Sequence, residues 1–222
     1  MRLLRLPGVF RPPTDTWMLA GVLRDEIASL APGAEVLDLC TGTGALALAA
    51  AEQGAHATAI DVSRRAAWNV RLNAVLNGVR VRALRGDLFG PVAGQRFDVI
   101  VTNPPYVPAP GERLPERGIE RAWHAGLDGR VLVDRICAEA PDYLKPGGAI
   151  LVVHSSINRE DETVARLAAS GLEVDVAYRE RGSFGPLMTE MAPELEARGL
   201  IAVGQREEDV VVVRGRKPRA GE

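Results

Sequence analysis

The sequence predicts an α/β protein with a doubly wound, mostly parallel seven-stranded sheet and an antiparallel C-terminal strand. Short apolar runs alternate with amphipathic segments of helical length along most of the chain. Helices of that length between strands require parallel pairing through right-handed crossovers. Near the C-terminus the alternation stops, because the last two apolar runs are joined by a long connection. With 222 residues and 46% hydrophobic content, one domain can bury its own core.

The elements follow from local signals. The first helix, 14–30, carries leucines on one face, and Pro32 and Gly33 separate it from the first strand. Ser63 is expected to cap a later helix. The turn Lys145-Pro146-Gly147-Gly148 precedes the fifth strand. We expect further helices that begin after the Gly44 loop and end near 53, and at 63–77, 126–143, 160–169 and 187–198. We expect strands at 35–39, 56–61, 79–85, 97–102, 149–153, 172–178 and 209–214.

We expect a single domain of three parts: a lead-in helix in 1–34, a core in 35–153, and a C-terminal region, 154–222, with an inserted helix. The formal net charge of -2 argues against binding nucleic acid mainly through a basic face. No apolar run approaches the ~20 residues that span a bilayer, and no signal peptide is evident, so we expect a cytoplasmic protein without a membrane partner. Cys40 and Cys137 have no second pair that would indicate a metal site.

The loop Asn103-Pro104-Pro105-Tyr106 directly follows the apolar run 97–102. In open α/β sheets, ligands bind outside the carboxyl ends of the strands. The prolines hold a rigid turn, the Asn carboxamide and a proline carbonyl offer two acceptors, and the aromatic ring can stack on a plane. The loop therefore indicates a site for an amide or an exocyclic amine.

Glycines and carboxylates at three other strand ends indicate a cofactor. Gly42 and Gly44 belong to a G-x-G-x-x-A loop that, by itself, also fits a dinucleotide and hence a dehydrogenase. Asp38 lies just before this loop, where it would repel a pyrophosphate but hold an ammonium. Asp61 can accept from ribose hydroxyls, and Asp87 from an adenine amine while Leu88 packs on the ring. These groups together point to S-adenosylmethionine.

With these loops, the chain resembles the HemK-like class I methyltransferases, which have a Rossmann-like fold. In that resemblance Val36 to Gly44, including Cys40, is the cofactor motif, and residues 103–106 form the motif for methylating planar nitrogens. The resemblance also implies that Thr16 and Asn103 contact the cofactor. Because no N-terminal helical domain precedes the core, the chain is similar to the short eukaryotic and archaeal branch. Ala125-Gly126 and the insertion at 187–206 depart from the family pattern.

The resemblance implies methylation of the glutamine in the Gly-Gly-Gln loop of a class I release factor, together with a small zinc-binding activator subunit that adds a strand to the sheet. We expect Asn103 and the Pro104 carbonyl to hold the amide hydrogens while Tyr106 packs on the amide plane, so that catalysis is mostly positioning. His124 is expected to be a bystander. Two other methyl acceptors are alternatives. Adenine N6 in DNA or RNA presents the same NH2 geometry after base flipping, and a small metabolite would need a closed apolar pocket.

Overall fold

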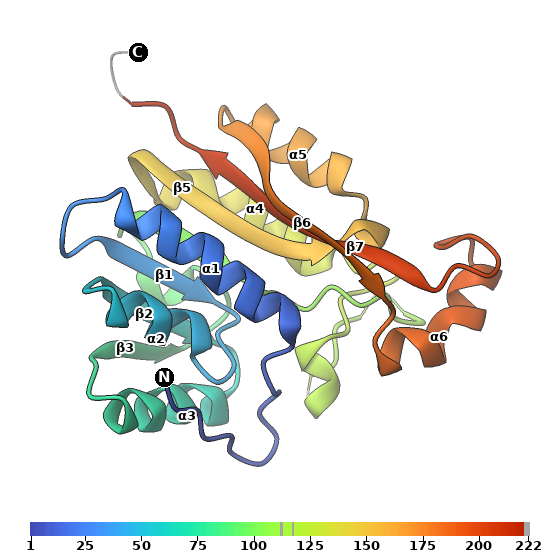
Figure 1. Ribbon diagram of the computed structural model, residues 1–222, viewed down its shortest axis with the longest axis horizontal. Coiled ribbons are helices and arrows are strands. Elements are labelled where there is room, and N and C mark those ends of the chain that lie inside the picture. The colour runs from blue at the N-terminus through green and yellow to red at the C-terminus, as the bar shows by residue number, and fades with distance from the viewer. Residues whose placement is uncertain (112, 117, 220–222) are drawn as a thin grey trace.

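The computed structural model describes residues 1–111, 113–116 and 118–219. Its centre is a seven-stranded sheet with strand order β3-β2-β1-β4-β5-β7-β6 (Figure 1). All pairs from β3 to β5 are parallel, whereas β7 is antiparallel to both β5 and β6. The predicted doubly wound sheet with an antiparallel C-terminal strand is therefore confirmed. The strands are β1 (Glu35–Leu39), β2 (His56–Asp61), β3 (Val81–Arg85), β4 (Phe97–Thr102), β5 (Leu144–Ser155), β6 (Glu173–Ser183) and β7 (Glu207–Arg216).

Helices cover both faces of the sheet. One core layer joins α1, α2 and α3 to one face through residues such as Leu23, Leu46 and Val70, and the other joins α4 and α5 to the opposite face through Ile136 and Leu167. Figure 1 shows α1 and α2 in front of the sheet and α4 and α5 behind it. The helices are α1 (Thr14–Ala28), α2 (Ala45–Glu52), α3 (Arg64–Leu76), α4 (Val131–Tyr143), α5 (Glu160–Ala169) and α6 (Pro186–Ala197), with 3-10 turns η1 (Gly90–Val92), η2 (Ile119–Ala122) and η3 (Ser156–Asn158).

Three predicted boundaries were wrong by several residues. The strand expected at 172–178 extends to Ser183, because it pairs with β7 as far as Glu207. The helix expected to begin at Gly126 begins at Val131, because Gly126 and Gly129 adopt positive φ in a turn that the buried Arg130 closes. The strand expected at 149–153 extends over Leu144–Ser155, because Phe97 pairs with Leu144 across a bulge and β7 pairs with β5 as far as Ser155. Long-range pairing, which no local pattern reports, therefore lengthened this strand.

The insertion forms a separate lobe. In the sequence, α6 follows β6 and precedes β7. It packs in a small hydrophobic core of Phe184, Met188, Ala192, Leu195 and Ile201, which also contacts Val107 after β4. Figure 1 shows α6 projecting beyond the end of the sheet. The lobe therefore stands beside the loop that follows β4.

None of the helices in the described part of the chain combines the length and the apolar character needed to cross a bilayer.

Candidate active site

One cavity of about 740 Å³ lies at the carboxyl ends of β1, β2, β3 and β4. The lead-in segment before α1, the loop around η2 and the start of α6 complete its walls. The predicted residues that line it are Thr16, Asp38, Cys40, Gly42, Asp61, Asp87, Leu88, Asn103, Pro104, Pro105 and Tyr106. The strand ends therefore bring the cofactor loops and the Asn103 loop into a single space, as expected for a doubly wound sheet.

Asp38 lies at the end of β1, beneath the glycine loop. Its Oδ2 accepts from Thr41 Oγ1 at 2.5 Å and from the Ala47 amide, in the first turn of α2, at 3.0 Å. Its Oδ1 is buried without a partner among the described residues, and so is Thr43 Oγ1. Burial raises the pKa of Asp38 to about 7, since these two hydrogen bonds offset only part of the desolvation. An approaching cationic donor would satisfy Oδ1 and favour the carboxylate.

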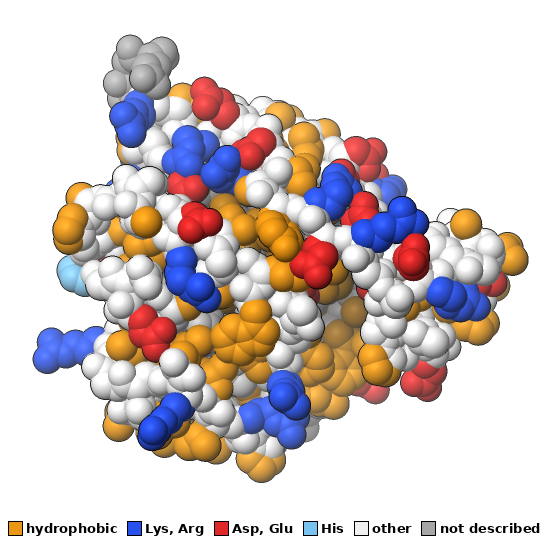
Figure 2. Space-filling view, in the orientation of Figure 1, with side chains coloured by type: hydrophobic (Ala, Val, Ile, Leu, Met, Phe, Trp, Pro, Cys, Tyr) orange, Lys and Arg blue, Asp and Glu red, His pale blue; other side chains and the backbone are white. Residues whose placement is uncertain are grey.

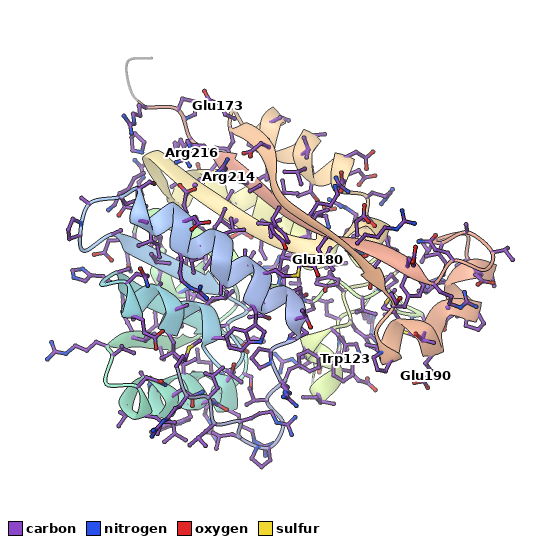
Figure 3. All side chains as sticks on the ribbon, viewed as in Figure 1. Trp123, Glu173, Glu180, Glu190, Arg214 and Arg216 are labelled. Carbon is purple, nitrogen blue, oxygen red and sulfur yellow. The ribbon has the colours of Figure 1, made fainter. Side chains whose placement is uncertain are left out.

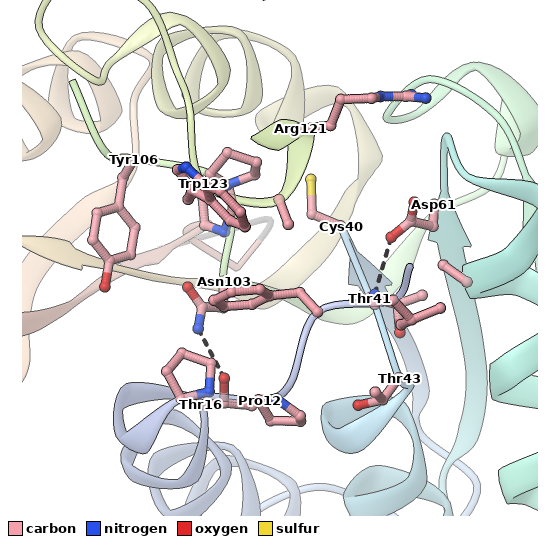
Figure 4. Close-up of a pocket in the computed structure, with 18 of the residues that line it drawn as sticks. Pro12, Thr16, Cys40, Thr41, Thr43, Asp61, Asn103, Tyr106, Arg121 and Trp123 are labelled. Atoms are coloured by element: carbon pink, nitrogen blue, oxygen red, sulfur yellow. Dashed lines mark hydrogen bonds between the residues drawn. The ribbon is translucent and has the colours of Figure 1, made fainter. Parts of the chain in front are cut away.

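Asp61 holds the glycine loop from the end of β2. Its two oxygens accept from the Gly42 amide at 3.0 Å (Figure 4) and from the Ser63 amide at 2.8 Å. Burial raises the pKa of Asp61, partly opposed by these hydrogen bonds and by Arg121. Gly44 does not line the cavity: it has φ of +88°, and an added Cβ would lie 3.0 Å from Val70. Gly44 thus allows a left-handed turn and close packing of α3.

The third strand end is more exposed. Asp87 forms an ion pair with Arg135 at 2.7 Å, and 60% of its side chain is exposed. Leu88 beside it is buried, with φ of +42°, and Cys40 has φ of +57°. Positive φ at residues other than glycine is unfavourable and is concentrated at functional sites. Burial, followed by the nearby Asp61, raises the pKa of the Cys40 thiol, so Cys40 offers the cavity a neutral sulfur.

The first turn of α1 fixes the Asn103 carboxamide. Asn103 Nδ2 donates to Thr16 Oγ1 at 2.9 Å (Figure 4). No described residue donates to Asn103 Oδ1 or to the Pro104 carbonyl. The NH2 group of Asn103 is therefore occupied, whereas Asn103 Oδ1 and the Pro104 carbonyl oxygen remain free to accept hydrogen bonds. Both oxygens belong to residues that line the cavity.

Asp15, in the same turn, holds Tyr106. The Tyr106 hydroxyl donates to Asp15 Oδ2 at 2.5 Å, and the Thr16 amide donates to Asp15 Oδ1 at 2.7 Å. Burial raises the pKa of Asp15, although hydrogen bonds from Tyr106, Thr16 and Asn103 oppose the shift. Glu208 also lines the cavity and accepts from Ser155 Oγ; burial and the charge of Asp15 raise its pKa. The wall of the cavity around Asn103 and Tyr106, which we call the acceptor side, therefore carries two carboxyl groups.

Asn158, at the end of η3, binds the backbone of the Asn103–Tyr106 loop. Its Nδ2 donates to the Tyr106 carbonyl at 2.7 Å and to the Asp128 carbonyl at 3.0 Å. Gly129 lies so close that an added Cβ would be 2.1 Å from the Tyr106 carbonyl oxygen. The loop after β4 is thus clamped between α1 and the segment before α4.

Apolar side chains form a groove that leads to Asn103. On one side Phe10 and Trp123 pack with ring centroids 5.4 Å apart, and on the other Leu187 and Met188 extend from α6. Figure 2 shows a hollow lined with hydrophobic side chains beside the α6 lobe, and Figure 3 places Trp123 between the α1 end and that lobe. Such a groove can accept an extended chain beside the cavity.

Sequence reasoning did not identify Asp15, Phe10, Trp123, Leu187 or Glu208 as site residues. Asp15 is the one with a usable signal, because it adjoins Thr16 in the lead-in segment that the family resemblance places against the cofactor. The others come from distant segments that carry no motif. His124, expected to be a bystander, does not belong to the cavity lining.

The residues present fit S-adenosylmethionine. The cavity presents Asp38, Asp61 and Asp87 to a ligand, and the unpartnered Asp38 Oδ1 needs a donor such as an ammonium. Three carboxylates in one cavity favour a ligand that carries an ammonium and a sulfonium over one that carries a pyrophosphate. In the described part of the chain, no cluster of three or more His, Cys, Asp or Glu could hold a metal ion.

Comparison with known proteins agrees with this geometry. Residues 1–116 match the methyltransferase small domain family. A putative protein N5-glutamine methyltransferase of Methanocaldococcus jannaschii is 34% identical over 82% of this chain and 90% of its own length. A release factor glutamine methyltransferase of Geobacter sulfurreducens is 38% identical over 66% of this chain, which spans 53% of that longer relative.

Solved structures show the same fold. The E. cuniculi Mtq2–Trm112 complex, responsible for methylation of the eRF1 translation termination factor, matches with a TM-score of 0.60 and 24% identity over 95% of this chain and 99% of the matched one. The chain therefore belongs to the methyltransferase small domain family and is a HemK-like, S-adenosylmethionine-dependent N-methyltransferase.

Proposed function

We propose that this enzyme methylates the side-chain amide nitrogen of a glutamine in a protein, with a class I release factor as the leading substrate. The observation that carries the proposal is the fixed Asn103 carboxamide, whose NH2 end is bound by Thr16 at 2.9 Å while Oδ1 stays open. Two open acceptors, Asn103 Oδ1 and the Pro104 carbonyl, match the two hydrogens of one NH2 group. The relatives named above as glutamine methyltransferases support this substrate class.

The residues act mainly by positioning. An amide nitrogen is a weak nucleophile because its lone pair is delocalised into the carbonyl. Two acceptors on its hydrogens would pull the nitrogen toward a pyramidal geometry, which localises the lone pair and aims it at the methyl group to be transferred. Tyr106, held by Asp15, packs on the amide. The bound cofactor supplies a methyl group on a cationic sulfur. No general base is needed before transfer, because the amide proton becomes acidic as the new bond forms.

The charge of the cavity favours a protein acceptor over a nucleic acid. Asp15 and Glu208 line the acceptor side, where in their ionised forms they would repel phosphates of a flipped nucleotide. The apolar groove between Trp123 and Met188 opens at the surface beside the cavity, which suits an extended peptide better than a metabolite that needs a closed pocket. A Gly-Gly-Gln loop can take such a path, because its glycines permit close backbone approach.

We also propose a small activator subunit at the β3 edge of the sheet. β3 pairs with β2 alone, and the neighbouring α3 exposes Trp68, Leu72 and Val75, the last with 81% of its surface accessible. An added strand would displace Arg71, whose Nη2 now donates to the Ala83 carbonyl at 2.9 Å. The similar Mtq2 was solved as a complex with Trm112, which supports a partner of this kind.

The test is methyl transfer from labelled cofactor, with and without a candidate activator, to a release factor, an adenine-containing oligonucleotide and small amides. Intact-peptide mass spectrometry should find one methyl on the Gly-Gly-Gln glutamine. The matched substrate, with that Gln→Asn, should stay unmodified because its shorter side chain cannot reach Asn103. Methylation of the oligonucleotide or of a metabolite, with the factor unmodified, would overturn the protein substrate.

A further inference from the structure

Three asparagines of α3 and its C-cap bind the first residues of the chain. Asn69, Asn73 and Asn77 recur every fourth residue and so lie on one face of the helix. Their Oδ1 atoms accept from the Leu6 amide at 2.7 Å, the Leu4 amide at 2.8 Å and the Arg2 amide at 2.6 Å, respectively. We call these three residues the asparagine ladder and residues 2–13 the strap.

The ladder spacing matches an extended chain. Four helical residues rise about 6 Å and two extended residues about 6.6 Å, so every second strap residue meets a new asparagine. The carboxamides of Asn73 and Asn77 also donate, to the Leu4 carbonyl at 3.0 Å and the Arg2 carbonyl at 2.7 Å. Each of these side chains therefore pairs with both backbone groups of one strap residue, as a neighbouring strand would.

These polar contacts, more than apolar burial, attach the start of the strap. Arg2, Leu4, Arg5 and Pro7 are exposed, with Leu4 49% accessible, whereas Asn69 and Asn73 are completely buried. If the strap detached, the buried Asn69 carboxamide would lose its hydrogen bonds to Leu6 and Leu4, and Asn73 would lose both of its bonds to Leu4, which is unfavourable. The ladder and the strap thus depend on each other.

Asn73 connects the strap to the cofactor loop. The same Nδ2 that donates to Leu4 also donates to the Thr43 carbonyl, between Gly42 and Gly44, at 2.9 Å. Beyond the ladder the strap continues through Gly8, Val9, Phe10, Pro12 and Pro13, which line the cavity. One buried amide therefore contacts both the glycine loop and the segment that walls the cavity.

We propose that Asn73 is a positioning residue for cofactor binding, and that the asparagine ladder holds the strap closed over the bound cofactor. The proposal rests on the cofactor assigned above but not on the glutamine substrate. Binding and closure are then thermodynamically linked: the cofactor stabilises the attached strap, and a detached strap lowers cofactor affinity.

The first experiment reads strap opening directly. Trypsin can cut after Arg2 and Arg5 in a detached strap, whereas Arg11 precedes Pro12 and resists cleavage. Saturating S-adenosylhomocysteine should slow the loss of residues 1–5, followed by intact mass, by about fivefold or more. Asn73→Ala should speed this loss by a similar factor and abolish most of the protection. An equal cleavage rate with and without ligand in the unaltered protein would overturn the linkage.

The second experiment measures S-adenosylhomocysteine affinity by calorimetry. Asn73→Ala should weaken binding by about fivefold or more, and Asn77→Ala, at the partly exposed end of the ladder, by about twofold. Leu4→Pro leaves α3 untouched but removes an amide that the ladder binds. Arg5→Pro is its matched control, because no ladder asparagine accepts from the Arg5 amide.

Leu4→Pro should weaken S-adenosylhomocysteine binding about as much as Asn73→Ala, and Arg5→Pro should leave it unchanged. This pair keeps the test valid where Asn73→Ala unfolds the protein. Affinity within twofold of the unaltered protein for Leu4→Pro, or an equal loss for Arg5→Pro, would overturn the proposal. Failure of glutamine methylation would leave these binding measurements unaffected, so the two proposals fail separately.

Discussion

The cofactor side and the acceptor side of the cavity are assembled differently. On the cofactor side, Asp38, Asp61 and Asp87 lie at the ends of three strands that follow one another along the chain. Asp38 and Asp61 contact the glycine loop, the start of α2 and the turn after β2, and Asp87 alone pairs with a distant helix, through Arg135. On the acceptor side, Asn103 and Tyr106 depend on Thr16 and Asp15, 87 and 91 residues away in sequence. The first side is a property of the strand-loop-helix unit, whereas the second depends on how α1 packs across the sheet.

This comparison predicts that the two sides can be damaged separately. Substitutions on the cofactor side should act on ligand affinity, and substitutions on the acceptor side should act on turnover or on protein binding. The following predictions run from the largest expected effect to the smallest.

Asn103→Ala should lower turnover about a hundredfold or more while cofactor affinity stays nearly unchanged, because the lost acceptor acts on the transition state. Single-turnover kinetics and calorimetry measure the two quantities. Thr16→Val is the matched variant: it keeps Asn103 but removes the acceptor that orients it, and should cost less. A parallel collapse of cofactor binding in Asn103→Ala would assign Asn103 a structural role instead.

Asp61→Ala should weaken cofactor binding by about 2 kcal/mol, because ribose hydroxyls lose a charged acceptor. The substitution also releases the Gly42 amide, which Asp61 holds at 3.0 Å. Thermal unfolding without cofactor therefore serves as the control for a loosened loop. Unchanged affinity, or preferential binding of a nicotinamide dinucleotide by the unaltered protein, would contradict the assigned cofactor.

Cofactor affinity should rise about tenfold between pH 6 and pH 8 because of Asp38. Burial raises the pKa of Asp38 to about 7, so the free enzyme holds a proton there at lower pH. An ammonium binds the carboxylate and must displace that proton, which makes binding weaker as the pH falls. Asp38→Asn should bind more weakly at pH 8 and show a flat profile; an unchanged slope would attribute the pH dependence to another group.

Met188→Ala should raise the KM for a protein substrate by about threefold with little change in turnover, because the groove wall on α6 contributes modest uniform binding. The small core behind Met188 makes a stability control necessary, and Leu187→Ser at the partly buried neighbouring position provides a second variant. An equal effect on a minimal glutamine peptide and on the intact factor would show that α6 does not contact the rest of the substrate.

The alternation of strands and helices, the glycine loop and the three carboxylates could be predicted from the sequence, because each is a local signal. Strand periodicity, the break at Pro32-Gly33 and the Ser63 cap act within a few residues of one another. The position of Asn103-Pro104 at a strand end followed in the same way. These signals sufficed for the fold and for the parts of the cavity formed by the strand-end loops, but not for the walls that the lead-in segment, η2 and α6 provide.

The tertiary structure alone decided the contacts between distant segments. Pairing with β7 lengthened β5, the packing of α1 brought Asp15 to Tyr106, and α3 aligned Asn73 with both Leu4 and Thr43. None of these pairs leaves a local pattern, because a hydrogen bond between residues far apart in sequence requires that both elements first be placed by burial of their apolar faces. The sequence therefore indicated which chemical groups form the site, whereas tertiary packing determined how those groups are placed relative to one another.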